Sequence, residues 1–329
     1  MTRTIFSAIV PSGRLTLGNY LGALRRFVSV QHEARCVFCI ADLHALTTDH
    51  DPRRLCQLAE ETVTLFLAAG LDPGVCVIVR QSDVPAHTEL SYLLECTAYT
   101  GELNRMIQFK EKGRGRPKTR VSLYTYPVLM AADILAYRTT EVPVGDDQRQ
   151  HLELARDLAL RFNRSYGEIF VVPEMSPAIV AARVMDLQDP TAKMSKSAPY
   201  DAAGTIRLLD SPDVIRRKIM RAVTDPGSEV RHDVENQPGI TNLLEILAAC
   251  LDENDPAALA RRYQSYGALK KDVAEAVVAV LDPLRKKCAD LAADPAYVNA
   301  TLRAGAERAQ ALAAPTVAAA KQAIGLGTL

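Results

Sequence analysis

The first half of the chain alternates short apolar runs with longer segments in which apolar residues recur every three or four positions. Short apolar runs predict β-strands, and the longer periodic segments predict α-helices. Their alternation is typical of a parallel sheet with helices on its faces. The predicted strands are Thr4–Val10, Cys36–Ala41, Val75–Gln81 and Glu141–Val144. The predicted helices among them are Tyr20–His32, Arg53–Ala69, Pro85–Tyr99, Pro127–Tyr137 and His151–Phe162.

The pattern changes after about Asp189, where strand signals fade and helical periodicity continues nearly to the end. We therefore expect an α/β fold: a Rossmann-like parallel-sheet domain over residues 1–188 and a helical domain over residues 189–329. The predicted helices of the second half are Ser211–Arg221, Asn242–Leu251, Pro256–Ser265, Leu269–Leu291, Pro295–Leu312 and Ala314–Ile324.

Composition narrows the class of protein. The 329 residues carry 39 basic and 39 acidic side chains, so a nucleic acid would have to be bound by a local basic patch. No apolar run approaches the roughly 20 residues of a membrane span, and the N-terminus reads as a strand and not as a signal peptide. Seven scattered cysteines favour reduced thiols in a cytoplasmic protein. Cys36 and Cys39 lie in an apolar run, so core packing is favoured over a metal site.

The pentapeptide Lys193–Ser197, of sequence KMSKS, lies near the predicted boundary between the two halves. Two lysines and two small hydroxyl residues suit the binding of a leaving polyphosphate, because such reactions depend on positioning and on neutralising negative charge. A solvated surface loop explains the same residues, and the motif alone leaves the two interpretations equally balanced.

A proline- and glycine-containing turn follows the first predicted strand and opens the first predicted helix, over residues 11–20. Ligands of doubly wound sheets bind at the carboxyl ends of strands, and helix N-termini favour anions. Gly13 and Gly18 allow backbone to approach a ligand closely, and Thr16 and Asn19 offer neutral donors. The segment has neither a Walker A nor a GxGxxG pattern, and a simple turn that begins a helix is the alternative.

These two motifs, about 180 residues apart, resemble the two signature motifs of class I aminoacyl-tRNA synthetases, with Thr16–Asn19 in the first position and Lys193–Ser197 in the second. The sequence between them is similar to tryptophanyl-tRNA synthetases in particular. The similar segments are Asp42–Ala45, Gly101–Met106, Tyr126–Leu135, Val142–Gln148, Gln150–Leu154 and Ala222–Asp225. The resemblance covers nearly the whole chain.

The resemblance implies a two-step acyl transfer. The tryptophan carboxylate attacks the α-phosphate of ATP, and the terminal adenosine of tRNA(Trp) then attacks the adenylate. The catalytic residues expected from it are Thr16, Asn19, Lys112, Lys193, Ser195 and Lys196. The residues expected to bind ATP are Pro11, Ser12, Gly13, Gly18, Asn19, Gly145, Asp146, Gln148 and Met194. Mg²⁺ is expected on the ATP phosphates and not at a protein-bound metal site. A homodimer is also expected from the resemblance alone.

Selecting tryptophan requires an apolar slot and an acceptor for the indole N–H, because a site with a buried acceptor rejects analogues that leave it unpaired. Spacing alone favours Asp133 as a surface carboxylate, but the resemblance makes it the indole acceptor. The other residues expected around tryptophan are Phe6, His44, Tyr126, Met130, Val142, Val144 and Gln148. The apolar members would otherwise be ordinary core, and a lone histidine is more often structural, so His44 receives no acid–base role.

Two basic clusters are candidates for RNA contacts. Residues 110–120 carry six positive charges and one negative, together with glycines and a proline, and predict a loop that is either solvated or bound to ATP phosphate and tRNA. The second cluster, Arg216, Arg217, Lys218 and Arg221, is either a solvated helix face or part of an anticodon-binding surface.

Three positions depart from the pattern of the family: Ala8, Val10 and Leu43 stand where Gly, Gln and Gln are common. Either substrate affinity has drifted, or the pocket excludes a tryptophan-like inhibitor and the chain is an auxiliary enzyme. The rival interpretations are a tyrosyl enzyme, a non-catalytic RNA-binding paralogue and a different nucleotidyltransferase. The Met130–Asp133 context disfavours the tyrosyl enzyme. The two intact motifs disfavour a non-catalytic paralogue, and the long helical half disfavours a different nucleotidyltransferase.

Overall fold

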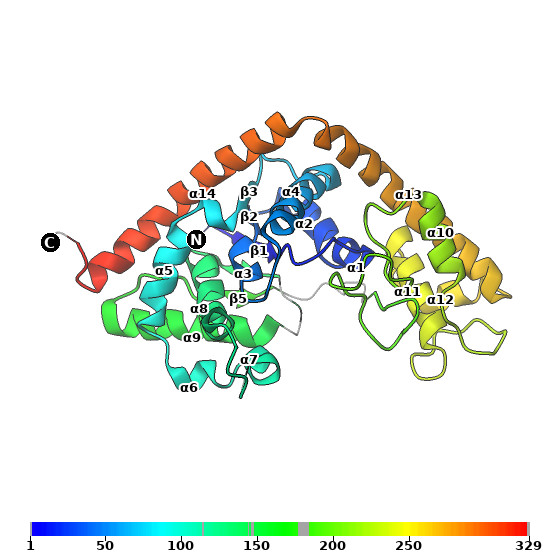
Figure 1. The fold of residues 1–329 in the computed structure, drawn as a ribbon, viewed down its shortest axis with the longest axis horizontal. Coiled ribbons are helices and arrows are strands. Elements are labelled where there is room, and N and C mark those ends of the chain that lie inside the picture. The colour runs from blue at the N-terminus through cyan, green and yellow to red at the C-terminus, as the bar shows by residue number, and fades with distance from the viewer. Residues whose placement is uncertain (1, 114, 144, 146–147, 177–183, 328–329) are drawn as a thin grey trace.

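The computed structural model describes residues 2–113, 115–143, 145, 148–176 and 184–327. Its centre is a five-stranded, wholly parallel sheet with the strand order β3-β2-β1-β4-β5 (Figure 1). The strands are β1 (Thr4–Ile9), β2 (Arg35–Ile40), β3 (Val77–Arg80), β4 (Glu141–Val142) and β5 (Glu174–Met175). The predicted α/β sheet is confirmed, and the four predicted strands are present; three end earlier or begin later than predicted, and the second is shifted by one residue toward the N-terminus. The two-residue strand β5 was not predicted.

The helices surround this sheet and extend beyond it. Those of the first half are α1 (Leu17–Asn19), α2 (Arg25–Val30), α3 (Asp42–Ala45), α4 (Pro52–Ala69), α5 (Ala86–Glu95), α6 (Thr100–Leu103), α7 (Ile107–Lys112), α8 (Val121–Leu135) and α9 (Arg149–Tyr166). A π-helical segment (Tyr20–Leu24) joins α1 to α2. Those of the second half are α10 (Pro212–Met220), α11 (Pro238–Leu251), α12 (Pro256–Ala260), α13 (Tyr266–Ala292) and α14 (Pro295–Ala323).

The core follows from the alternation of side chains along the strands. Successive strand residues point to opposite faces of a sheet. Ile5 and Ile9 of β1 pack with Phe38 of β2 in one apolar cluster, and Phe6 packs with Val37 in the other. Both faces of the sheet are therefore buried, as parallel sheets require.

The last helix returns to the α/β half. Residues 295–323 form one continuous helix with Pro315 inside it, so the predicted break after Leu312 was wrong. Figure 1 shows α13 rising from α10–α12 and α14 descending along β3 and α5. Gly305 allows the close contact, because a Cβ there would lie 1.9 Å from the carbonyl oxygen of Ile78. The domain boundary at residue 188 stays a prediction, and α14 lies against the domain that precedes that boundary.

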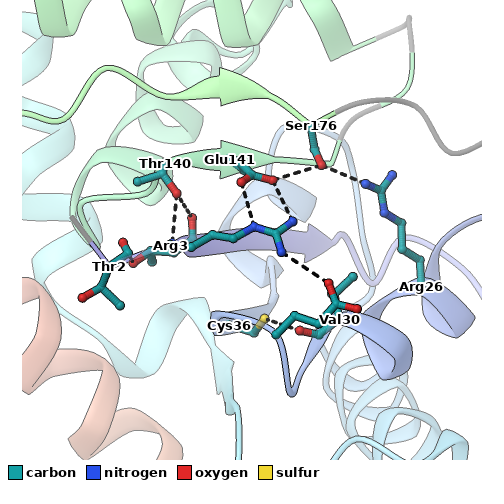
Figure 2. Close-up of polar contacts among 10 residues, drawn as sticks. Thr2, Arg3, Arg26, Val30, Cys36, Thr140, Glu141 and Ser176 are labelled. Atoms are coloured by element: carbon teal, nitrogen blue, oxygen red, sulfur yellow. Dashed lines mark hydrogen bonds and ion pairs between the residues drawn. The ribbon is translucent and has the colours of Figure 1, made fainter.

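A polar cluster fixes the short strands beside β1 (Figure 2). Both ends of the Glu141 carboxylate accept from the Arg3 guanidinium, at 2.8 and 3.0 Å. Arg26 Nη2 donates to the Ser176 hydroxyl at 2.8 Å, and that hydroxyl lies 3.4 Å from Glu141. The hydrogen bonds from Arg3 lower the pKa of Glu141. This cluster positions β4, from which the chain continues toward the expected substrate residues 142–148.

Among the described residues, no helix combines the length and the apolar composition that crossing a membrane would need.

Candidate functional site

The turn after β1 is paired with a buried segment near the KMSKS motif. Leu17 N donates to the carbonyl of Ile206 at 2.9 Å, and Leu208 N donates to the carbonyl of Leu15 at 3.0 Å. Thr16 and Arg207 thus form an antiparallel bridge. The two predicted motifs, far apart in sequence, belong to neighbouring parts of one structure.

Asn19 folds back over the start of α1. Its Oδ1 accepts from Thr16 N at 3.0 Å and from the Thr16 hydroxyl at 3.1 Å. This satisfies a backbone donor at the helix N-terminus and leaves the Asn19 side-chain NH₂ as the group that can donate outward. Thr16 is 1% exposed, so its role is to orient Asn19 and the first turn.

Lys196 of the KMSKS motif reaches the end of β1. Its Nζ donates to the carbonyl of Val10 at 2.5 Å. Burial lowers the pKa of this ammonium to about 8. A partly desolvated cation at the carboxyl end of a central strand is well placed to attract a phosphate.

The loop lies so close to the first turn that only glycine fits at position 13. A Cβ on Gly13 would lie 2.2 Å from the carbonyl oxygen of Lys196. Met194 is buried in the apolar core and fixes the motif to it, while Lys193 and Ser195 are exposed. The Ser195 and Ser197 hydroxyls are 2.9 Å apart. The motif therefore presents its polar residues outward from a fixed base.

The Asp133 carboxylate accepts hydrogen bonds from three side chains of the α/β half. It is 1% exposed on α8, so the surface-carboxylate interpretation of its spacing was wrong. Gln81 Nε2 donates to both carboxylate oxygens, at 2.8 and 2.9 Å. His44 Nε2 donates to Oδ2 at 2.8 Å, and His87 Nδ1 donates to Oδ1 at 2.6 Å.

The network keeps Asp133 ionised. Burial by itself would raise the pKa of this carboxyl, but the interaction with His87 and the hydrogen bonds from both histidines outweigh burial and lower it. His87 is fixed in turn, because the Tyr137 hydroxyl donates to its Nε2 at 2.7 Å. The structure thus holds a buried acceptor where the indole reader was expected.

Four of the other residues expected around tryptophan, Phe6, Tyr126, Met130 and Val142, lie near this carboxylate or in the surrounding core. Phe6 stacks on Tyr137, with ring centroids 5.7 Å apart, and Val142 is buried in the same apolar cluster. Met130 is partly buried against that cluster. Tyr126 lies edge-on to the His44 ring, and its hydroxyl is 2.6 Å from His151 Nε2. Burial raises the pKa of the Tyr126 phenol.

A cavity of about 290 Å³ opens beside this group, between α3, α5 and α8. Leu43 and Tyr126 contribute to its wall, together with Thr88, Ser91 and Leu129. Its volume is at the lower limit for a small-molecule site.

Among the described residues, several that were expected to bind ATP or tryptophan take no part in the contacts around Asp133 or the KMSKS motif. Lys112 is exposed at the end of α7, and within the described part of the chain no hydrogen bond or ion pair involves it. Pro11 is buried and Ser12 exposed in the first turn, Gly18 lies on α1, and Gly145 accepts a backbone hydrogen bond from Gln148 at 2.9 Å. Val144, Asp146 and Arg114 lie outside the described residues.

The departures from the family pattern sit at the same edge. Ala8 is exposed although β1 is the central strand, which means that the sheet face carrying Phe6 is open at this point. Val10 supplies the carbonyl that Lys196 contacts. Leu43 N donates to Gln81 Oε1 at 3.1 Å, which ties that position to the Asp133 network.

Sequence reasoning missed three residues of this arrangement: Gln81, His87 and Arg207. Gln81 is the last residue of the third predicted strand and directly follows β3, so the rule that ligands bind at the carboxyl ends of parallel strands could have identified it. His87 and Arg207 carried no comparable signal: the contact of His87 with Asp133 is long-range, and the loop carbonyls around Arg207 follow no periodic pattern.

Comparison with known proteins assigns the fold and both motifs to a family. Residues 2–282 match the family described as tRNA synthetases class I (W and Y). The chain belongs to this family. A class I synthetase of this kind from Streptomyces coelicolor, "Tryptophan--tRNA ligase 1", is 59% identical over 99% of the chain and 98% of its own length. "Tryptophan--tRNA ligase" from Caldanaerobacter subterraneus is 49% identical over 98% of both chains.

Solved structures of the family agree. The tryptophanyl-tRNA synthetase of Mycoplasma pneumoniae superimposes with a TM-score of 0.90 at 37% identity, covering 99% of each chain. The Campylobacter jejuni enzyme, complexed with ADP and tryptophan, has a TM-score of 0.83 at 35% identity and covers 98% of this chain and 100% of its own. An Aeropyrum pernix tyrosyl-tRNA synthetase shares the fold at 22% identity.

Class I synthetases of this family use ATP. Within the described residues, no group of three or more His, Cys, Asp and Glu side chains could hold a metal ion. All seven cysteines are free, and Cys36 and Cys39 are buried in β2, which confirms them as core residues.

Proposed function

We propose that the chain is a tryptophan–tRNA ligase. It activates L-tryptophan with ATP to tryptophanyl-adenylate and pyrophosphate, and it then transfers the tryptophanyl group to the 3′ end of tRNA(Trp). The observation that carries the proposal is the joining of the two signature motifs: Lys196 Nζ lies 2.5 Å from the Val10 carbonyl, directly before the first turn. The relatives at 49% and 59% identity are tryptophan–tRNA ligases, and they indicate tryptophan as the amino acid in this proposal.

In the first step, the residues of the two motifs act on charge and position. The Lys196 ammonium lies where the departing pyrophosphate gains negative charge, and Lys193 and Ser195 approach from the exposed side of the same loop. The free amide NH₂ of Asn19 and the N-terminus of the first turn orient the phosphates or ribose. Lys112, Gly145, Asp146 and Gln148 complete the ATP site in this proposal. Mg²⁺ is carried on the ATP phosphates.

Amino-acid selection rests on Asp133 in the same proposal. A carboxylate that is buried and ionised accepts the indole N–H and discriminates against side chains that cannot donate there. Phe6, Met130, Val142 and Val144 line the indole slot. Tyr126 and Gln148 meet the substrate ammonium, with the Tyr126 hydroxyl oriented by His151.

The RNA contacts are also part of the proposal. Arg116 and Arg120 extend from the loop between α7 and α8, and Arg120 is already ion-paired with Asp49. Replacing Arg114, Arg116 and Arg120 together weakens tRNA binding and spares adenylate formation; equal tRNA affinity across a salt series contradicts this role. We further propose a cytoplasmic homodimer.

The departures at Ala8, Val10 and Leu43 support an auxiliary, inhibitor-resistant form. All three lie at the open edge above β1 or against the Asp133 network. Val10→Gln restores the common residue and increases sensitivity to an indole antibiotic. Equal sensitivity of the two proteins counts against the auxiliary role.

Aminoacylation tests the proposed function. Purified protein, ATP and labelled tryptophan are incubated with a tRNA(Trp) transcript, and the acid-precipitable label is measured. The expected result is charging of tRNA(Trp) and not of tRNA(Tyr). Absence of charging with an active tRNA(Trp) control contradicts the proposal.

A further inference from the structure

Arg207 stands out among the residues that neither motif includes. Arg207 is only 3% exposed, although its side chain carries a charged guanidinium. A buried arginine is normally paired with a carboxylate, because an unpaired buried charge is costly. Among the described residues, no carboxylate lies within ion-pair distance of this guanidinium.

Four backbone carbonyls receive its donors instead. Nη2 donates to the carbonyls of Ala198 and Pro199, both at 2.8 Å. Nε donates to the carbonyl of Tyr200 at 3.4 Å, and Nη1 lies 3.5 Å from the carbonyl of Arg14. The guanidinium therefore forms hydrogen bonds with the three residues that follow the KMSKS loop, and it contacts the turn after β1.

The backbone of Arg207 is held independently of its side chain. Ile206 and Leu208 are both fully buried, and their backbone groups pair with Leu17 and Leu15. Arg207 N donates to Asp210 Oδ2 at 3.0 Å, and Lys218 Nζ reaches the same oxygen at 2.8 Å. Removing the guanidinium leaves this frame in place and releases residues 198–200 together with the contact to the Arg14 carbonyl.

We infer that Arg207 is a positioning residue for the activation step: it fastens the exit of the KMSKS loop to the segment paired with Thr16. The loop thereby keeps the Lys196 ammonium at the end of β1 during the chemical step. This inference rests on the proposed function, because it assigns the lysines of the motif to ATP.

Arginine suits this task better than lysine. Its planar fork presents several donors in fixed directions, whereas a lysine ammonium is a single point with a flexible stem. Backbone carbonyls do not neutralise the guanidinium, so its positive charge adds to the field that the polyphosphate experiences. Tyr200 covers one side, with the Arg14 and Arg207 guanidinium carbons 5.0 and 5.8 Å from its ring centroid.

The test compares Arg207→Met, which keeps the apolar stem, and Arg207→Lys, which keeps a charge. Tryptophan-dependent ATP–pyrophosphate exchange gives kcat and the KM for ATP, and calorimetry gives the Kd for tryptophan. We expect Arg207→Met to lower kcat/KM for ATP by roughly 10- to 100-fold, the cost of a misplaced catalytic group. The Kd for tryptophan stays within about twofold, and Arg207→Lys recovers part of the loss.

Arg262→Met is the matched control, because Arg262 makes an exposed bidentate pair with Glu253 and, among the described residues, has no hydrogen bond or ion pair with either motif. It leaves every constant unchanged. Unchanged kcat/KM in Arg207→Met, or an equal loss in tryptophan affinity, overturns the inference.

A second readout does not depend on activity. Cleavage by trypsin after Lys196, followed by mass spectrometry, is expected to be about tenfold faster in Arg207→Met than in the wild type. If Arg207→Met fails to fold, Arg207→Lys carries both measurements. Equal cleavage rates overturn the inference. A wild-type protein without tryptophan-dependent exchange would instead refute the proposed function.

Discussion

His44 Nε2 donates to Asp133 Oδ2 at 2.8 Å, and this hydrogen bond uses the last acceptor position of a buried carboxylate. Gln81 occupies one position on each oxygen and His87 occupies the second position on Oδ1. His87 and Gln81 are 0% exposed and are held by further partners. The His44 side chain is 10% exposed, and within the described residues its ring has no other hydrogen bond. An indole N–H that binds Asp133 therefore replaces His44.

This exchange predicts a spectroscopic change at His44. The Nε2–H proton of His44, assigned by its absence in His44→Gln, is expected in the free protein and lost on saturation with L-tryptophan. ATP alone leaves it in place. The chain contains no tryptophan, so fluorescence of the bound ligand reports saturation. A resonance that persists in the saturated protein contradicts the exchange.

Replacing Asp133 by Asn is expected to destabilise the protein by roughly 3–5 kcal/mol, because three buried donors lose a charged acceptor. The change also alters the pH dependence. Since the folded state lowers the pKa of Asp133, its contribution is present above the ordinary value near 4 and is lost as pH falls through the folded pKa. Urea unfolding between pH 3 and 7 tests this. We expect the variant to lose less stability in acid than the wild type; parallel curves contradict it.

The lowered pKa of Lys196 predicts an alkaline limit on ATP use. Because burial lowers the pKa to about 8, the free enzyme loses this ammonium above that pH, and kcat/KM for ATP falls about tenfold per pH unit. Lys196→Arg keeps its charge and shifts the decline to higher pH, although its absolute activity is lower. The measurement is the pH profile of ATP–pyrophosphate exchange for the wild type and for Lys196→Arg. Identical declines at alkaline pH in the two proteins would contradict the role of Lys196.

Gly13→Ala is expected to separate the two motifs. The new methyl group would meet the Lys196 carbonyl at 2.2 Å, so the KMSKS loop must move. We expect kcat/KM for ATP to fall by roughly 10- to 100-fold with little change in tryptophan affinity. Gly267→Ala is the control, because a Cβ at Gly267 meets nothing within 4 Å. Wild-type kinetics in Gly13→Ala would refute the close packing of loop and turn.

The sequence predicted the parallel sheet because each longer strand is a continuous apolar run. It missed β5, whose two residues, Glu174 and Met175, are both exposed and directly follow Pro173. The helix predicted from Pro127 begins at Val121 instead, since proline is normally a first-turn residue but here lies inside α8. The predicted break after Leu312 likewise falls inside α14, where packing against β3 and α5 keeps the helix continuous through Pro315.

The candidate site was predictable only in part. Asp133 was singled out as a lone carboxylate among apolar residues, but its burial follows from partners 46 to 89 residues away, which no local pattern specifies. Arg207 was not predicted either: its place beside the first turn follows from the pairing of Leu15–Leu17 with residues 206–208, which no local pattern specifies.

ATP–pyrophosphate exchange with tryptophan, with tyrosine and without an amino acid tests the central claim most directly. If Asp133 accepts an indole N–H and the two motifs activate ATP, tryptophan supports exchange at least about a thousandfold better than tyrosine, and the background without amino acid is negligible. Lys196→Met abolishes the tryptophan-dependent rate. Exchange driven equally by tyrosine, or no exchange with either amino acid, would contradict the account.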